Sequence, residues 1–152
     1  MIFQNKKYRS GVFFVVYKIE KGKPIFLIQK RKLHWKGYEF PKAGIEKGER
    51  PINTVRREVF EETGLAIKKI KNHHKRGKYF YKKIFEDRPK IIGQTWKLYS
   101  VEVLDGKIKI DEKEHYSAQW LDYKEARKKI SFENQKECLD IVYNWLMKKL
   151  KY

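Results

Sequence analysis

The segment PKAGIEKGERPINTVRREVFEETGL, from Pro41 to Leu65, gathers five glutamates in a chain whose formal net charge is +18. Pro51 suits the first turn of a helix, where its missing backbone N–H has no partner to lose, and Gly64 suits the left-handed residue after a helix end. These two residues predict a helix over 51–63.

The predicted helix has one apolar side, on which Ile52, Val55 and Val59 fall within a single stripe at 3.6 residues per turn. Such a stripe docks against a sheet. Before the segment, the apolar runs Gly11–Ile19 and Ile25–Gln29 are separated by KGKP and predict two buried strands at hairpin distance. The segment is therefore expected to lie on a sheet that begins near the N-terminus.

Further elements are predicted after the segment. Strands are expected at Lys78–Glu86, Thr95–Val103 and Ser117–Leu121. A final helix is expected with Ser131 as its N-cap. Its apolar residues recur at helical spacing and are Leu139, Val142, Tyr143, Leu146 and Leu150.

Three glutamates of the first helix, Glu58, Glu61 and Glu62, stand at i, i+3 and i+4, so their side chains project toward one shared volume. Without a positive charge among them, at least one carboxyl group should have a raised pKa and stay protonated. A hard divalent cation resolves this repulsion, because it takes oxygen ligands and bridges carboxylates to phosphates. Arg57 could hold Glu58 by a bidentate pair, and Glu49 could reach the same volume. Taken alone, three such glutamates are more often a solvated helix face.

The wider pattern resembles the signature of the Nudix hydrolase family: a glycine, five residues, a glutamate, seven residues, then Arg-Glu-apolar-x-Glu-Glu-x-Gly-apolar. The matching residues are Glu49, Arg57, Glu58, Val59, Glu61, Glu62, Gly64 and Leu65. The leading glycine aligns with Ala43, and Gly44 comes one residue late. An alanine forced into positive φ would be strained by about 1 kcal/mol or more, so Ala43 is expected to be tolerated with negative φ.

The length of 152 residues allows one core and predicts a single domain over 1–152. The resemblance implies that the signature at about 43–65 forms a loop, helix and loop on an α/β/α sandwich with a central mixed sheet. It implies hydrolysis of a nucleoside diphosphate linked to another group, with Mg²⁺ or Mn²⁺ as cofactor. The implied metal ligands are Glu58, Glu61, Glu62 and the main-chain carbonyl of Ala43. The implied catalytic residues in the signature are Arg57, Glu61 and Glu62.

Weaker resemblances cover most of the chain. YRSGVFFVV, YEFPKAGI, IGQTWKLY and SFENQKECLDIVYNWL are similar to bacterial RNA pyrophosphohydrolases and their dinucleoside polyphosphate relatives, which implies that Arg9 points at phosphate. In EKEHYSAQWL, Glu114 resembles the loop glutamate of diadenosine tetraphosphate hydrolases and is a candidate general base. The alternative is that Glu114 belongs to a solvated acidic loop with Asp111 and Glu112.

Substrate contacts are expected from residues near the signature and from the segment GKYFYKKI. Lys42 and Lys83 are candidates for phosphate, while Tyr79 or Tyr81 could stack on a purine. Which ring faces the substrate depends on strand register. The four histidines show no metal-ligand spacing and are expected at the surface or in hydrogen bonds: His34, His73, His74 and His115.

The excess of 37 Lys and Arg over 19 Asp and Glu creates a positive field that would concentrate phosphates or nucleic acid. The alternative is a heat-loving or AT-rich source, with ion pairs spread over the surface. The basic runs Lys30–Lys32 and Lys68–Lys78 are accordingly either solvated faces or flanks of a binding cleft. Cys138 is the only cysteine, which excludes an internal disulfide. With no apolar run of about 20 residues, a cytoplasmic protein without membrane contact is expected.

The sequence thus favours a metal-dependent hydrolase of nucleoside polyphosphates, most similar to enzymes that cleave dinucleoside polyphosphates such as diadenosine tetraphosphate. Removal of pyrophosphate from RNA 5′ ends uses the same chemistry and would better explain the charge. A nucleotide- or RNA-binding module without turnover is the alternative of another class, and Ala43 is the residue that suggests it. The oligomeric state is left open.

Overall fold

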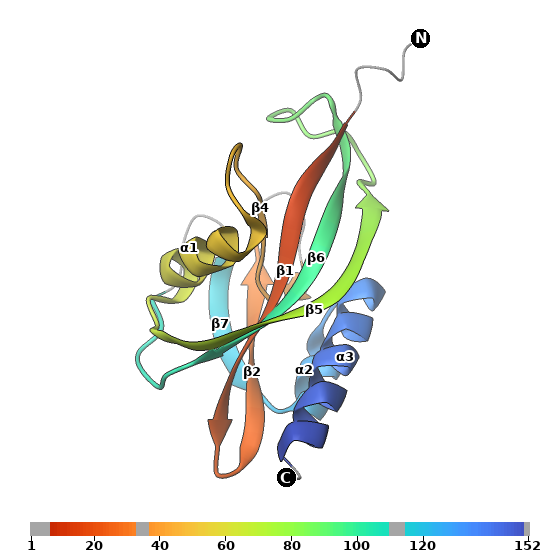
Figure 1. Ribbon diagram of the computed structural model, residues 1–152. Helices are drawn as coiled ribbons and strands as arrows, with labels where there is room; N and C mark the ends of the chain where they lie inside the picture. The colour runs from red at the N-terminus through yellow and green to blue at the C-terminus, as the bar shows by residue number, and fades with distance from the viewer. Residues whose placement is uncertain (1–6, 33–36, 110–114, 151–152) are drawn as a thin grey trace.

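The computed structural model describes residues 7–32, 37–109 and 115–150. Its strands are β1 (Lys7–Glu20), β2 (Lys23–Arg31), β3 (Gly37–Glu39), β4 (Lys42–Gly44), β5 (Ile67–Phe80), β6 (Ile91–Val103) and β7 (His115–Leu121), and its helices are α1 (Pro51–Thr63), α2 (Tyr123–Lys129) and α3 (Glu133–Leu150) (Figure 1). The strands form one seven-stranded sheet in the order β3-β2-β1-β6-β5, with β4 beside β1 and β7 beside β2.

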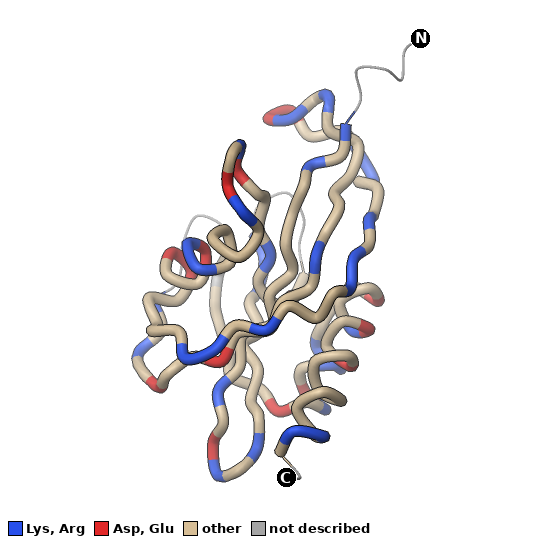
Figure 2. The backbone as a smooth tube through the Cα atoms, in the orientation of Figure 1, with Lys and Arg blue, Asp and Glu red and all other residues tan. Residues whose placement is uncertain are grey.

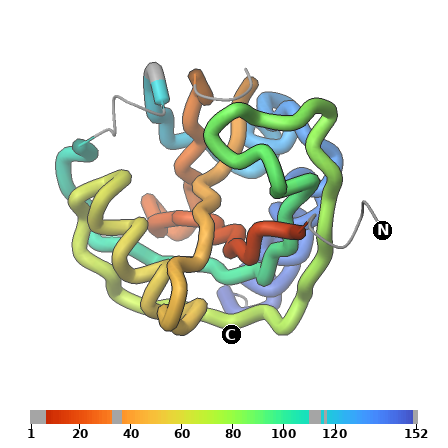
Figure 3. The backbone as a smooth tube through the Cα atoms, turned by 90° about the horizontal axis from the view of Figure 1, so that it is seen from above, coloured from red at the N-terminus to blue at the C-terminus, as the bar shows by residue number. Residues whose placement is uncertain are grey.

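The sheet is mixed and lies between helices. β1 and β6 run parallel, whereas the other paired strands run antiparallel. Seen along the strands, α1 lies on one side of the sheet and α2 and α3 lie on the other (Figure 3). The expected α/β/α sandwich is therefore confirmed.

β1 is buried on both faces, which explains its nearly unbroken apolar run. Successive side chains of a strand point to opposite faces. Val12, Phe14 and Val16 accordingly pack toward α1 in one core. Phe13 and Val15 pack toward α2 and α3 in the other core. The first predicted strand is confirmed, and it extends further at both ends.

β1 has two different neighbours on the side away from β6. Its residues Gly11–Phe13 pair with β4, whereas Tyr17–Glu20 pair with β2 across a tight hairpin. The turn residues Lys21 and Gly22 have φ of 51° and 79°, as a type I′ hairpin turn requires. The sheet therefore branches between β4 and β2, and charged residues gather at this branch.

α1 has the bounds that the sequence predicts. Pro51 occupies its first turn, and Gly64 ends it with φ of 69° while its N–H donates to the Phe60 carbonyl at 2.9 Å. Val55 and Val59 are fully buried, so the predicted stripe does dock on the sheet.

The strand expected at 78–86 was placed wrongly. β5 begins at Ile67 and ends at Phe80, so most of the basic run is a strand. Hydrophobic alternation could not reveal it, because few of its residues are buried on either face. Its register also shifts between Asn72 and Arg76, where His74 has φ of 55°.

The start of the last helix also differs from the prediction. α3 begins at Glu133, and the Ser131 hydroxyl accepts the Tyr38 N–H at 2.9 Å, which ties the helix start to β3. The sequence did not predict α2, a short helix capped by Asp122, which accepts the Glu125 N–H at 2.9 Å. Among the described residues, no helix is long and apolar enough to cross a membrane.

Candidate active site

The signature begins in β4, where Ala43 lies opposite Val12 of β1. Among the described residues, positive φ outside glycine occurs only at Lys21 and His74, so the prediction of negative φ at Ala43 is confirmed. The next position is Gly44, and the Arg9 guanidinium occupies the space that a Cβ there would take.

Glu49 anchors the turn before α1. Its Oε1 accepts the Thr54 hydroxyl at 2.7 Å and the Glu46 N–H at 3.2 Å. Arg57 donates to both carboxylate oxygens, from Nε to Oε2 at 2.8 Å and from Nη2 to Oε1 at 3.1 Å. The hydrogen bonds from Arg57, followed by the one from Thr54, lower the pKa of Glu49 from 4.5 to about 2. Glu49 is therefore an ionised carboxylate held in one orientation.

The remaining nitrogen of Arg57 reaches two helix glutamates. Nη1 donates to Glu58 Oε1 at 2.7 Å and to Glu61 Oε2 at 3.2 Å. The bidentate pair expected with Glu58 is thus made with Glu49 instead. Consecutive helix residues point about 100° apart, so Arg57 meets Glu58 with one nitrogen only. Arg57 supplies positive charge among the crowded carboxylates.

The three helix glutamates differ in exposure. The side chain of Glu61 is 50% exposed and that of Glu58 is 16% exposed, whereas Glu62 is 1% exposed with both carboxylate oxygens buried. Within the described part of the chain, no three His, Cys, Asp or Glu side chains are gathered as a ready-made metal site. Glu114, the candidate general base, lies outside the described residues.

The chemistry of the donors nevertheless fits a hard divalent cation. Three carboxylates and the Ala43 carbonyl offer only oxygen, which Mg²⁺ and Mn²⁺ prefer. A carboxylate as buried as Glu62 is stable in its ionised form only beside compensating positive charge. The residues that could hold a metal are therefore those of α1 and β4 together.

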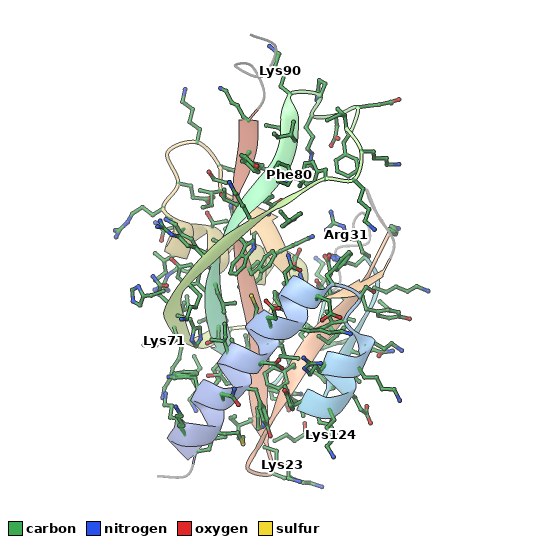
Figure 4. All side chains as sticks on the ribbon, turned by 90° about the vertical axis from the view of Figure 1, so that its right-hand side faces the viewer. Lys23, Arg31, Lys71, Phe80, Lys90 and Lys124 are labelled. Atoms are coloured by element: carbon green, nitrogen blue, oxygen red, sulfur yellow. The ribbon has the colours of Figure 1, made fainter. Side chains whose placement is uncertain are left out.

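A second group of charges lies at the sheet branch, where Glu39 is fully buried. Its Oε2 lies 3.4 Å from Arg31 Nη1 and 3.3 Å from His115 Nε2, and its Oε1 lies 3.6 Å from Lys42 Nζ. Burial raises the pKa of Glu39, but Lys42, His115 and Arg31 more than offset this and lower it to about 2. Figure 4 labels Arg31, at the end of β2.

Lys42 connects this cluster to the predicted substrate residues. It is 9% exposed, donates to the Tyr79 hydroxyl at 3.3 Å, and lies 5.3 Å and 5.5 Å from the ring centroids of Tyr79 and Phe132. Burial lowers the pKa of Lys42 to about 8, although Glu39 opposes the shift. Lys42 is thus a buried cation against an aromatic ring.

The other predicted substrate residues are only partly brought together. Tyr81 lies 6.1 Å from Tyr79 between ring centroids, and its hydroxyl accepts from Arg88 Nη1 at 3.3 Å. Arg9 is exposed, and its positive charge acts on Tyr79. Lys83 is exposed beyond the end of β5.

Sequence reasoning missed Arg31, Glu39 and Arg88, and it assigned no particular partner to His115. His115 is 1% exposed and contacts Glu39, so the hydrogen-bonding alternative is confirmed for it and the surface alternative is wrong. The one available signal was Glu39 itself, an acidic residue between aromatic neighbours just before the signature. Its partners come from other strands, so no local spacing could reveal them.

Fold and site together define a class of protein: an α/β/α sandwich with a glutamate motif organised by Arg57 on the α1 side of the sheet and a buried lysine, Lys42, on the other side. A protein-family model described as the NUDIX domain matches residues 7–140. The chain therefore belongs to the NUDIX family.

The relatives agree with this membership. The chain is 34% identical over 115 residues to an RNA pyrophosphohydrolase from a Nitratiruptor species, covering 73% of this chain and 74% of that protein. A solved Ap4A hydrolase binary complex from C. elegans has a TM-score of 0.73 at 18% identity, covering 92% of this chain and 98% of that one. The NUDIX domain of Shewanella oneidensis NrtR, complexed with ADP ribose, has a TM-score of 0.74 at 13% identity, covering 93% and 90%. With its family, this chain is a hydrolase that acts on phosphoanhydrides.

The two hydrogen bonds from Arg57 to Glu49 predict a low pKa for the Glu49 carboxyl group. In metal-free buffer the wild-type carboxyl should titrate at about 2. Lysine lacks the two-pronged donor geometry, so in Arg57→Lys the pKa of Glu49 should rise toward 4.5. Carbon-detected NMR of the side-chain carboxyl measures both values, with Arg56→Lys as the matched control on the exposed side of α1. An unchanged pKa in Arg57→Lys would contradict the assignment of the shift to Arg57.

Proposed function

We propose that this protein hydrolyses the phosphoanhydride bonds of nucleoside polyphosphates, using Mg²⁺ or Mn²⁺ held by Glu58, Glu61, Glu62 and the Ala43 carbonyl. The observation that carries the proposal is the Arg57 network, which holds Glu58 and Glu61 of α1 together with Glu49 of the preceding turn. NUDIX enzymes generally use divalent metal ions. When bound, such a cation neutralises the charge of the phosphate chain and polarises its phosphoryl oxygens.

The residues of the chain have separate roles in this proposal. Arg57 is a positioning residue, because it fixes Glu49 and orients Glu58 and Glu61. Glu114 takes the proton of the attacking water as general base; it directly precedes His115, which is buried against Glu39. Glu62 adds a negative charge inside the protein, where a cation is attracted more strongly than at the surface.

On the other side of β4, Lys42 is the proposed phosphate contact. It lies beside Tyr79, and the pair offers a cation and an aromatic ring to a nucleotide. Tyr81 and Arg9 extend this set, and Lys83 would contact outer phosphates. The pairing of a cation with an aromatic ring suits a nucleotide with a phosphate chain, and a dinucleoside polyphosphate such as diadenosine tetraphosphate is the first substrate class.

RNA with a 5′-triphosphate end is the second candidate substrate. The observation that favours it is the 34% identity to an RNA pyrophosphohydrolase over 73% of the chain. The net charge of +18 also suits a long polyanion.

A substrate screen tests the proposal. The protein should release nucleotides from diadenosine tetraphosphate, or pyrophosphate from triphosphate RNA, in the presence of Mg²⁺ or Mn²⁺. Chromatography identifies the products, and chelation with EDTA should abolish turnover. Tight binding of both substrates without turnover under any of these metal conditions would instead favour the non-catalytic binding module.

The role of Glu62 is tested by Glu62→Gln, which removes the charge and nearly keeps the shape. Turnover should fall at least about 10²-fold, as when an electrostatic contact to the transition state is lost. Binding of Mn²⁺, followed by electron paramagnetic resonance, should weaken as well. Glu133→Gln, on a side chain that is 80% exposed, is the control. Near-normal turnover in Glu62→Gln would refute the assigned role.

The lowered pKa of Lys42 predicts that kcat/KM decreases on the alkaline side of its pH profile. As pH rises through about 8, Lys42 loses its charge, so kcat/KM for diadenosine tetraphosphate should fall. Arginine stays charged throughout this range, and Lys42→Arg should therefore lack the decrease at about pH 8. Lys23→Arg, in the exposed hairpin, should keep the wild-type profile. A decrease that persists unchanged in Lys42→Arg would exclude Lys42 as its cause.

A further inference from the structure

Part of the sheet face on the α1 side is open beyond the helix, and it carries aromatic rings. Tyr8, Gly93 and Phe80 lie side by side on β1, β6 and β5. Because Gly93 has no side chain, the rings of Tyr8 and Phe80 meet above it at a centroid distance of 5.5 Å. Phe80 is 64% exposed, so most of its ring is open to solvent.

Cations follow this aromatic pair along the same face. Lys78 lies opposite Thr95, with its Nζ 5.2 Å from the ring centroid of Tyr8. Two residues further along, Arg76 lies opposite Lys97. Among the described residues, none of these three cations forms an ion pair with a carboxylate. Figure 2 shows Lys and Arg positions along β5 and β6.

The three cations Arg76, Lys78 and Lys97 also line a cleft of about 640 Å³. Its lining contains basic, polar and apolar residues and no acidic one: Ser10, Gly11, Ile45, Arg76, Gly77, Lys78, Thr95, Trp96 and Lys97. Ile45 belongs to the turn that follows β4, so the cleft borders the signature loop.

The register connects this cleft to the candidate active site. The row of Arg76 and Lys97 continues across β1 at Val12 and reaches Ala43 in β4. Neighbouring strands lie about 4.8 Å apart, so the row crosses four strands in a short distance. A chain lying over Phe80 and the cations would have one end directed toward β4.

We infer that this open face binds the single-stranded part of an RNA chain whose 5′ end enters the active site. Free bases stack on exposed aromatic rings, and the phosphates between them need a line of cations; Phe80 with Tyr8, and Arg76 with Lys97, supply both. The inference rests on the second proposed substrate. It assigns to β5 and β6 a surface separate from the Lys42 and Tyr79 group, which faces α3.

The test measures binding of an RNA oligonucleotide of about 10 nucleotides with a 5′-hydroxyl end, by fluorescence anisotropy at several salt concentrations. The double variant Arg76→Gln/Lys97→Gln should bind at least about 10-fold more weakly. For single strands each lost phosphate contact reduces the salt slope by about 0.7, so the slope should become shallower by about 1.4. Phe80→Ser should weaken binding at least about 5-fold, because base stacking is lost.

The matched control is Lys23→Gln/Lys124→Gln, which makes the same change in net charge at two exposed lysines of the β1–β2 hairpin and α2 (Figure 4). It should bind RNA nearly as the wild type does. Equal RNA binding by the two double variants would overturn the inference. Equal affinity of the wild type for an RNA duplex and for the single strand would also overturn it, because a duplex hides its base faces. A third contradicting result would be binding to phosphatidylserine vesicles in place of RNA. Thermal unfolding confirms that each variant is folded.

The 5′-hydroxyl probe contains no phosphoanhydride, so this measurement does not depend on hydrolysis. If the substrate screen fails, RNA binding by this face can still be observed. If the screen succeeds and the variants bind the probe like the wild type, the surface is excluded while the proposed hydrolysis remains.

Discussion

The contact between one guanidinium and the carboxylates around it holds the acidic segment in a single conformation. Arg57 spans from the turn to the helix, with two nitrogens on Glu49 and the third shared by Glu58 and Glu61. Glutamates on one helix face repel each other, so a helix this acidic needs a cation near them. Because Glu49 also holds the turn, the same contact links the end of β4 to α1.

β4 is the short strand at which the two sides of the molecule meet. Lys42 and Ala43 are consecutive and therefore point to opposite faces. Lys42 turns toward α3, where it contacts Tyr79 and the buried Glu39. Ala43 turns toward α1, at the end of the row formed by Arg76 and Lys97. One dipeptide thus joins the proposed nucleotide contacts to the open basic face.

The parts of the fold that sequence predicted well are those controlled by local chemistry. The bounds of α1 follow from Pro51 and Gly64, and β1 is visible as a two-sided apolar strand. β5 was misplaced because it is largely exposed and carries a register shift at Asn72, so it has no apolar alternation to detect. The short β3 and β4 offer too few residues for any period.

The sequence by itself determined the order of the signature, since Glu49, Arg57 and Glu62 belong to one continuous segment and helix periodicity sets the spacing of Arg57 and Glu62 within α1. Only the tertiary structure decided that Arg57 makes its bidentate pair with Glu49 and meets Glu58 through Nη1 alone. It also decided which side chains surround Glu39 and which cations line up with Ala43. The contacts of Glu39 and the row of cations join strands far apart in the chain, and their register depends on how the whole sheet packs between its helices.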